Sequence, residues 1–183
     1  MSRKLALIVL AVWLAAGTVA GGVLLLRHAA LRVPASTSAT LRTAVSRALP
    51  PSGRWGMVHV MYRECTCSTK TIVHLIGRRA LPGIDELVLV VDDGGVSSPE
   101  DQRLRDAGFG VGVITPSVLR DTYAITAAPV LVVARPDREL AYVGGYNRHK
   151  QEPRFMDVAI VRDAMHDATV SPLPVFGCLT VSP

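Results

Sequence analysis

The chain has 183 residues, which is enough for one membrane anchor and one domain of ordinary size. Hydrophobic residues make up 49% of it and aromatic residues only 5%, a composition that suits a small core of Val, Leu, Ile and Ala. The formal net charge is a modest +5, and no basic stripe interleaved with aromatic residues is present. We therefore expect no nucleic-acid partner.

The first predicted element is an uncharged apolar run over residues 5–26, which follows two basic residues. About 20 apolar residues in a helix span the hydrocarbon of a bilayer, so the run predicts a single transmembrane signal-anchor within residues 1–32. A cleaved signal peptide is the alternative, but its cleavage site at residues 18–20 is poor. The basic residues on the two flanks do not decide the orientation. Because a short tail before a first apolar helix usually stays cytoplasmic, we expect a bacterial-type cell membrane with the domain on the periplasmic or extracellular side.

Residues 33–53 are rich in Ala, Ser, Thr and Pro and are interpreted as a linker. It ends in, or docks as, a short helix over residues 39–49, which Pro50 and Pro51 stop. The folded domain is then expected over residues 54–183.

The domain alternates strands with helices. In chain order, the apolar periodicity and the turn residues predict a strand over 56–62, a helix over 68–79, a strand over 87–91, a helix from 97 to 108, a strand over 109–114, a short helix over 117–122, strands over 130–134 and 139–143, and a helix over 154–167. This order predicts the α/β class, with a parallel sheet covered on both faces and a terminal hairpin that adds antiparallel edge strands.

The three cysteines are too few for a disulfide-built scaffold and odd in number for simple pairing. Cys65 and Cys67 follow the first strand where its helix begins, a position that favours the nucleophilic thiolate. We expect Cys65 to be the attacking thiol, because it lies nearest the exposed start of the helix. Two buried, inert cysteines are the alternative. Cys178 either folds back to this pair as a third thiol or packs as a tail cysteine, and the apolar residues around it favour docking of the tail.

Two segments and the element order resemble the thioredoxin superfamily. The segments are residues 62–70, Tyr-Arg-Glu-Cys-Thr-Cys-Ser-Thr-Lys, and residues 127–133, Ala-Ala-Pro-Val-Leu-Val-Val. The resemblance covers about residues 56–167. It implies a thioredoxin-like fold with a central mixed sheet, a cis peptide bond before Pro129, and an Ala128 backbone that meets a substrate strand beside the reactive cysteine.

The motif departs from the usual Cys-x-x-Cys, because one residue separates Cys65 from Cys67. A disulfide between them closes a small, strained ring, and a strained disulfide is more oxidising, which favours an isomerase or an oxidant. Alternatively, Cys65 forms mixed disulfides that Cys67 releases. Arg63 and Lys70 are expected to stabilise a thiolate here. The direction of the redox reaction stays open.

The leading interpretation is a membrane-tethered thiol–disulfide oxidoreductase or isomerase that acts through Cys65 and Cys67 on exported client proteins with thiols or disulfides. We expect no cofactor and no resident metal. One alternative is a copper chaperone that holds Cu(I) on these two cysteines with Cys178 or a histidine. Another is a binding module whose thiols are incidental.

The histidines show no ligand spacing. His59 and His74 fall on a predicted strand and helix, where a hydrogen-bonded structural role is expected. His149, near the Gly144–Gly145 turn, is the one histidine that we single out for a test.

Overall fold

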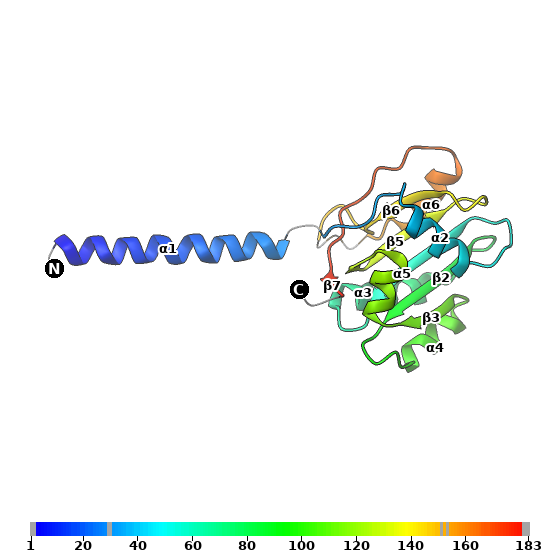
Figure 1. Ribbon diagram of the computed structural model, residues 1–183, viewed down its shortest axis with the longest axis horizontal. Helices are drawn as coiled ribbons and strands as arrows, with labels where there is room; N and C mark the ends of the chain where they lie inside the picture. Colours follow the sequence, from blue (N-terminus) through cyan, green and yellow to red (C-terminus); the bar gives the residue numbers. More distant parts are fainter. Residues whose placement is uncertain (1–2, 29–30, 151, 153, 181–183) are drawn as a thin grey trace.

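A five-stranded sheet forms the centre of the fold, with the strand order β3–β2–β1–β5–β6 (Figure 1). The strands are β1 (Gly56–Tyr62), β2 (Asp85–Val91), β3 (Gly110–Ile114), β5 (Val130–Ala134) and β6 (Leu140–Gly144). β1, β2 and β3 are parallel, β5 is antiparallel to β1, and β6 is antiparallel to β5. The structure is a computed structural model that describes residues 3–28, 31–150, 152 and 154–180.

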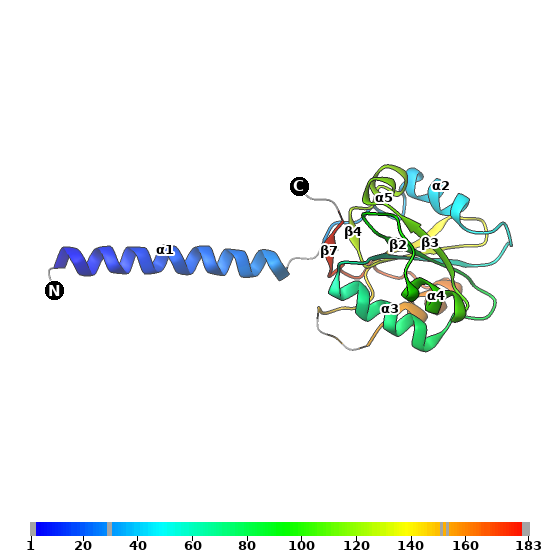
Figure 2. The same cartoon turned by 90° about the horizontal axis from the view of Figure 1, so that it is seen from below.

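Helices cover both faces of this sheet. The helices of the domain are α2 (Ala39–Ala48), α3 (Thr66–Arg78), α4 (Pro99–Asp106), α5 (Pro116–Tyr123) and α6 (Asp157–Met165). α2 and α5 pack on one face, and α3, α4 and α6 pack on the other (Figure 2). The parallel strands require such crossover helices, since a hairpin cannot connect them.

The residues of β1 show how the two cores arise. Val58 and Val60 join the cluster beneath α2 and α5, whereas Met57 and Met61 join the cluster beneath α3, α4 and α6. Successive side chains of a strand point to opposite faces, so a strand buried on both faces has an almost continuous apolar sequence. This explains why the apolar runs of β1, β2 and β5 predict central strands.

The predicted order of elements is confirmed. The strands over 56–62 and 130–134 have the predicted bounds, and the helix predicted over 154–167 is shorter, at Asp157–Met165. Two short strands were not predicted: β4 (Ala127–Ala128) and β7 (Cys178–Leu179), which pair antiparallel with each other.

The segment interpreted as a linker, residues 33–53, contains α2. Leu41 and Val45 of this helix are fully buried and Ala44 nearly so, in the cluster that α5 also lines. Ser38 caps the helix, because its hydroxyl accepts a hydrogen bond from the Leu41 N–H. The segment therefore takes the docked-helix form of the prediction.

Helix α1 (Arg3–His28) lies apart from the domain (Figure 1). Within the described residues, no helix combines the length and the apolarity needed to cross a bilayer. The anchor expected over residues 5–26 is therefore not confirmed and stays a prediction.

A network of buried charges joins α3, β2 and α6. Arg78 contacts Glu86 and donates from Nε to Asp157 at 2.7 Å. His59 hydrogen-bonds to Glu86 at 2.9 Å, and His74 to Asp157 at 3.0 Å. The hydrogen-bonded structural role expected for the two histidines is confirmed.

The network holds both carboxyl groups in the charged form. Burial by itself raises the pKa of Glu86, but hydrogen bonds from His59 and Arg78 outweigh burial and lower this pKa to about 2. Burial also raises the pKa of Asp157, and the hydrogen bond from His74 together with the charge of Arg78 lowers it to about 2. Both carboxylates are therefore paired, as buried charges must be.

Candidate thiol site at the start of helix α3

A tight connection between β1 and α3 positions Cys65. The Cys65 N–H donates to the Tyr62 carbonyl at 3.0 Å, and the Tyr62 N–H donates to the Ser68 hydroxyl at 3.0 Å. Cys65 is the N-cap residue of α3, with extended backbone angles of φ −101° and ψ 115°. Its carbonyl accepts the first helical hydrogen bond, from the Thr69 N–H. The fold therefore fixes Cys65 where the free N–H groups of the helix begin.

Cys65 forms a disulfide with Cys178, and Cys67 keeps a free thiol. The two bonded residues are 113 positions apart in sequence, with their Cα atoms 5.8 Å apart. The Cys65–Cys67 bond considered as one possibility from the sequence is not the bond in this structure. The physical reason is that residues two apart at the start of a helix point in different directions. The alternative in which Cys178 folds back to the pair is the one that the structure takes.

Cys65 is not accessible in this oxidised form, and the expectation that it is the attacking thiol stays a prediction. The residue is 0% exposed, and its sulfur lies 3.7 Å from the Ala128 carbonyl oxygen. The same sulfur is bonded to Cys178 of the C-terminal segment. Cys67 and Cys178 are both partly exposed, so these two residues are the cysteines with solvent-exposed surface.

The Ala128–Pro129 peptide bond is cis, which confirms the expectation for Pro129. Ala128 lies beside the thiols, as its contact with the Cys65 sulfur indicates. Its backbone does meet an antiparallel strand, but this strand is β7 of the same chain, where Cys178 pairs with Ala128 and Leu179 pairs with Ala127.

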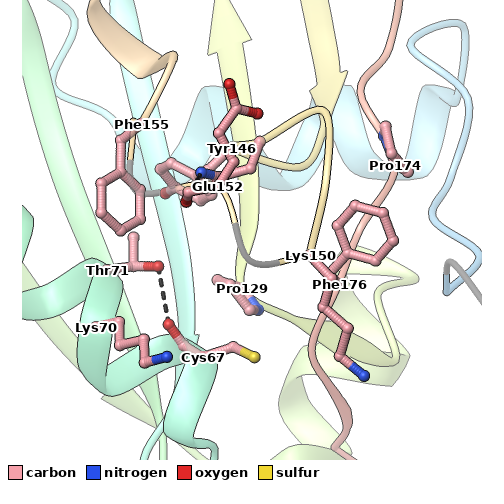
Figure 3. Close-up of a pocket in the computed structure, with 11 residues that line it drawn as sticks. Cys67, Lys70, Thr71, Pro129, Tyr146, Lys150, Glu152, Phe155, Pro174 and Phe176 are labelled. Carbon is pink, nitrogen blue, oxygen red and sulfur yellow. Dashed lines mark hydrogen bonds between the residues drawn. The ribbon is translucent and has the colours of Figure 1, made fainter. Parts of the chain in front are cut away.

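A pocket of about 360 Å³ opens beside the free thiol (Figure 3). It is lined by Cys67, Lys70, Thr71, Pro129, Tyr146, Asn147, Lys150, Glu152, Phe155, Pro174 and Phe176. The Thr71 hydroxyl donates to the Cys67 carbonyl at 3.0 Å, which holds the first turn of α3 at the pocket wall. The pocket combines aromatic and proline surfaces with two lysines, one glutamate and a thiol.

Only one of the two cations expected near the thiols lines this pocket. Lys70 does so, one helical turn after Cys67. Arg63 instead forms ion pairs with Asp92 at 2.7 Å and Asp101 at 3.2 Å. It therefore fixes the turn before Cys65 to the start of α4. His149 is exposed and is not among the pocket residues, and its role stays untested.

Sequence reasoning missed the aromatic wall of the pocket, which Tyr146, Phe155 and Phe176 form. It also missed Gly177, which lies directly before the bonded cysteine. The signal for the C-terminal part was present in the apolar tail around an odd third cysteine. No comparable signal marked Tyr146, which lies just after β6. Phe155 falls within the helix predicted over residues 154–167, where an apolar residue indicates core packing and not a site.

The copper alternative stays a prediction. In the part of the chain that the structure describes, no group of three or more His, Cys, Asp or Glu side chains is arranged to hold a metal ion. In this oxidised form, two of the three sulfurs named for copper are bonded to each other.

Comparisons with known proteins give the fold. No protein-family model matches the chain, and no curated protein matches it. A hypothetical protein from Sinorhizobium meliloti is similar in structure at 14% identity, over 71% of this chain and 80% of its own, with a TM-score of 0.52. An uncharacterized conserved protein from Geobacillus kaustophilus has 11% identity, over 72% of this chain and 78% of its own, and a TM-score of 0.52.

A looser likeness is to a secreted Mycobacterium tuberculosis disulfide oxidoreductase, at 9% identity over 60% of this chain and 82% of that chain, with a TM-score of 0.43. At such identities the comparisons speak to fold alone. The mixed sheet, the cysteine that caps α3 and the cis-proline beside it agree with what the sequence resemblance implies. The chain therefore has a thioredoxin-like fold.

Proposed function

We propose that this protein is a thiol–disulfide oxidoreductase whose redox couple is Cys65 and Cys178, and that its clients are proteins with thiols or disulfides. The observation that carries the proposal is the disulfide between the cysteine that caps α3 and a cysteine of the C-terminal segment. The start of a helix stabilises the thiolate that leaves when such a bond is broken. The couple thus has a good leaving group at Cys65 and a partly exposed residue at Cys178.

The difference in burial sets the order of events when the oxidised protein meets a client dithiol. A client thiolate attacks the sulfur of Cys178, a partly exposed residue, because Cys65 is fully buried. The Cys65–Cys178 bond breaks, Cys65 departs with the bonding electron pair as a thiolate, and a client–Cys178 mixed disulfide forms.

A second client thiolate then attacks the client sulfur of this mixed disulfide. Cys178 leaves as a thiolate, and the client gains a disulfide. The client has lost two electrons and two protons. The protein has gained two electrons, and its two thiolates take up protons from water. In the opposite direction, the reduced couple gives two electrons to a client disulfide and its two cysteines become bonded to each other.

Cys67 is not part of this couple. Its thiol opens on the pocket, where it can exchange with mixed disulfides formed nearby. We therefore assign it an auxiliary role, with Cys65 and Cys178 as the essential pair.

We also propose that residues 5–26 tether the protein to a bacterial-type cell membrane, with the domain on the exported side. Supporting this are the uncharged apolar sequence of the run and exposed apolar side chains on α1 such as Val12, Trp13 and Val19. A disulfide persists in an oxidising compartment, which supports the exported side. Membrane fractionation, followed by alkylation with a reagent that does not cross membranes, tests both statements.

The function is tested on the full chain in detergent, with reduced, unfolded ribonuclease as the client dithiol. We expect the oxidised protein to form client disulfides. We expect Cys65→Ser and Cys178→Ser each to lower the rate on the order of 100-fold, because each removes half of the couple. Cys67→Ser is the matched control and keeps most of the activity. Wild-type rates in both couple variants would overturn the proposal. So would purified protein that carries stoichiometric copper and shows no exchange.

A further inference from the structure

The end of the chain occupies a backbone edge beside the redox couple. We call residues 126–128 the docking strip and residues 176–180 the strap. The strap runs antiparallel to the strip, with Cys178 opposite Ala128 and Leu179 opposite Ala127. The Thr180 N–H donates to the Thr126 carbonyl at 2.9 Å. The disulfide of Cys178 to Cys65 is the covalent link between the strap and the site.

The strip accepts only glycine before the bonded cysteine. A Cβ atom on Gly177 would lie 2.6 Å from the Ala128 carbonyl carbon and 2.7 Å from Cδ of Pro129, and it would overlap the Ala128 oxygen. Real Cβ atoms essentially never come within 3.0 Å of another atom. The obstructing atoms belong to the backbone and to a proline ring, so they cannot rotate away.

The residue before this glycine lies at the pocket. Phe176 lines the pocket that Pro129, Phe155 and the free thiol of Cys67 also line (Figure 3). The strap therefore places an aromatic side chain at the wall of the pocket, a glycine against Ala128, and a cysteine on Cys65. The strap carries these three residue types in this order, as Phe176, Gly177 and Cys178.

The chain upstream of the strap is held separately. The Gly145 N–H donates to the Leu173 carbonyl at 2.9 Å, and the Leu31 N–H donates to the Val175 carbonyl at 2.8 Å. The strap contains a polar group without a partner. The buried Thr180 hydroxyl has no hydrogen-bond partner among the described residues. An unpaired buried hydroxyl opposes docking. Once the disulfide is reduced, the strap can leave the strip while its upstream anchor stays in place.

We propose that the docking strip selects extended client segments with a glycine directly before the cysteine, and that the strap is its internal occupant in the oxidised form. This inference rests on the proposed function and names its substrate class. Strap and client exclude each other, because both require the Ala128 backbone and the Cys65 sulfur. The client segment adds to the strip as an antiparallel strand.

Reduction of a client disulfide takes three steps. A dithiol donor protein reduces the Cys65–Cys178 bond, and the strap leaves. The Cys65 thiolate attacks the cysteine of a docked client disulfide, and the other client sulfur departs with the electron pair as a thiolate. The client segment leaves the strip while its cysteine is still bonded to Cys65, and the strap returns. The Cys178 thiolate then attacks the Cys65 sulfur, which displaces the client cysteine as a thiolate and restores the Cys65–Cys178 bond. The client has gained the two electrons that the donor supplied.

The first test measures selectivity at Cys65. In the full chain with Cys67→Ser and Cys178→Ser, Cys65 is the sole thiol. Two peptides that differ only in Phe-Gly-Cys against Phe-Ala-Cys, each activated as a thiopyridyl disulfide, are mixed with this variant, and thiopyridone release is followed by absorbance. We expect the glycine peptide to react about tenfold faster or more, which corresponds to about 1.4 kcal/mol or more of discrimination. Dithiodipyridine, which needs no docking, reports the intrinsic reactivity of Cys65.

Equal rates for the two peptides, or no reaction with either, overturn the inference. If Cys65 still reacts with dithiodipyridine and the wild-type protein still oxidises reduced ribonuclease, the proposed function survives that result. Loss of both of these reactions would overturn the function as well.

The second test addresses the strap in the otherwise native chain. Gly177→Ala is expected to lower the equilibrium constant for Cys65–Cys178 formation against a glutathione buffer by about tenfold or more. It is also expected to raise the rate with the Phe-Gly-Cys peptide. Ser171→Ala, an exposed change on the same tail, is the matched control and leaves both unchanged. An unaltered equilibrium constant in Gly177→Ala contradicts the inference.

Discussion

The two ends of helix α3 have opposite properties. The last turn carries Arg78, which is held between the buried carboxylates of Glu86 and Asp157 by hydrogen bonds and ion pairs. The first turn carries a redox-sensitive bond at Cys65 and a partly exposed thiol at Cys67. The comparison teaches that the permanent contacts of this helix lie at one end, which leaves the other end free to make and break a covalent bond without loss of the fold.

Removal of the permanent contact gives the largest expected effect. Arg78→Ala leaves two buried carboxylates without their shared cation, so we expect the free energy of unfolding to fall by about 3–5 kcal/mol. Denaturant titration of the full chain measures it. Arg103→Ala, whose side chain is 64% exposed and pairs with Glu100 at 3.7 Å, is the control and should change little. Equal losses in both variants would show that the network does not stabilise the helix.

Reduction of the bond at the other end should cost less. The Cys65–Cys178 disulfide spans 113 residues, and such cross-links stabilise proteins typically by about 2–4 kcal/mol. We expect reduction to lower the unfolding free energy by that amount and to expose the strap to limited proteolysis, with the rest of the domain intact. Mass spectrometry of the fragments checks this. Cleavage throughout the domain after reduction would contradict a local change at the first turn of α3.

Acid should act on the end of α3 that contains Arg78. The pKa of Glu86 is about 2 in the folded chain against an ordinary 4.5, and that of Asp157 is about 2 against 3.8. A folded pKa below the unfolded one adds stability that is complete above the unfolded value and is lost as the pH falls toward the folded value. For Glu86 about 2 kcal/mol is lost by pH 3.

Unfolding midpoints measured from about pH 7 down to about pH 2 test this expectation. Glu86→Gln should flatten the fall, because the titrating carboxyl is absent. If the wild type and this variant lose stability in parallel, another group is responsible.

The smallest expected effect concerns Tyr146, which connects the pocket at the first turn of α3 to the charge network at its last turn. Tyr146 lines the pocket near Cys67, and its hydroxyl hydrogen-bonds to Nδ1 of His59 at 2.7 Å. Tyr146→Phe removes one partner of a buried histidine, which should cost about 1–2 kcal/mol of stability. We expect no change in the thiol chemistry of Cys65. Thermal unfolding and thiopyridine exchange, measured side by side with Tyr123→Phe as control, separate the two readouts. A change in exchange rate alone would show that the two ends are coupled.

Much of this architecture is present as local pattern in the sequence. The apolar runs at residues 56–62 and 130–134 are buried on both faces, so composition alone marks them as central strands. Helix α3 follows from the apolar spacing of Ile72, Leu75 and Ile76. The cis bond at Pro129 came from resemblance to a family, since residue chemistry favours trans.

The pairing of Cys65 with Cys178 could not be predicted, because it depends on the path of the tail. That path is set by contacts between residues far apart in the chain, such as the Leu173 N–H with the Tyr142 hydroxyl at 3.1 Å. Close approach also matters, since a Cβ on Gly145 would overlap the Pro174 oxygen. Strands β4 and β7 have two residues each, too few to show periodicity.

The most direct test is differential alkylation of the three cysteines in native membranes, with mass mapping of the peptides before and after reduction. The account predicts that Cys67 is alkylated at once, and that Cys65 and Cys178 are recovered as one linked pair of peptides. A Cys65–Cys67 link, or a Cys178 that is freely alkylated while Cys65 is bonded elsewhere, would contradict it.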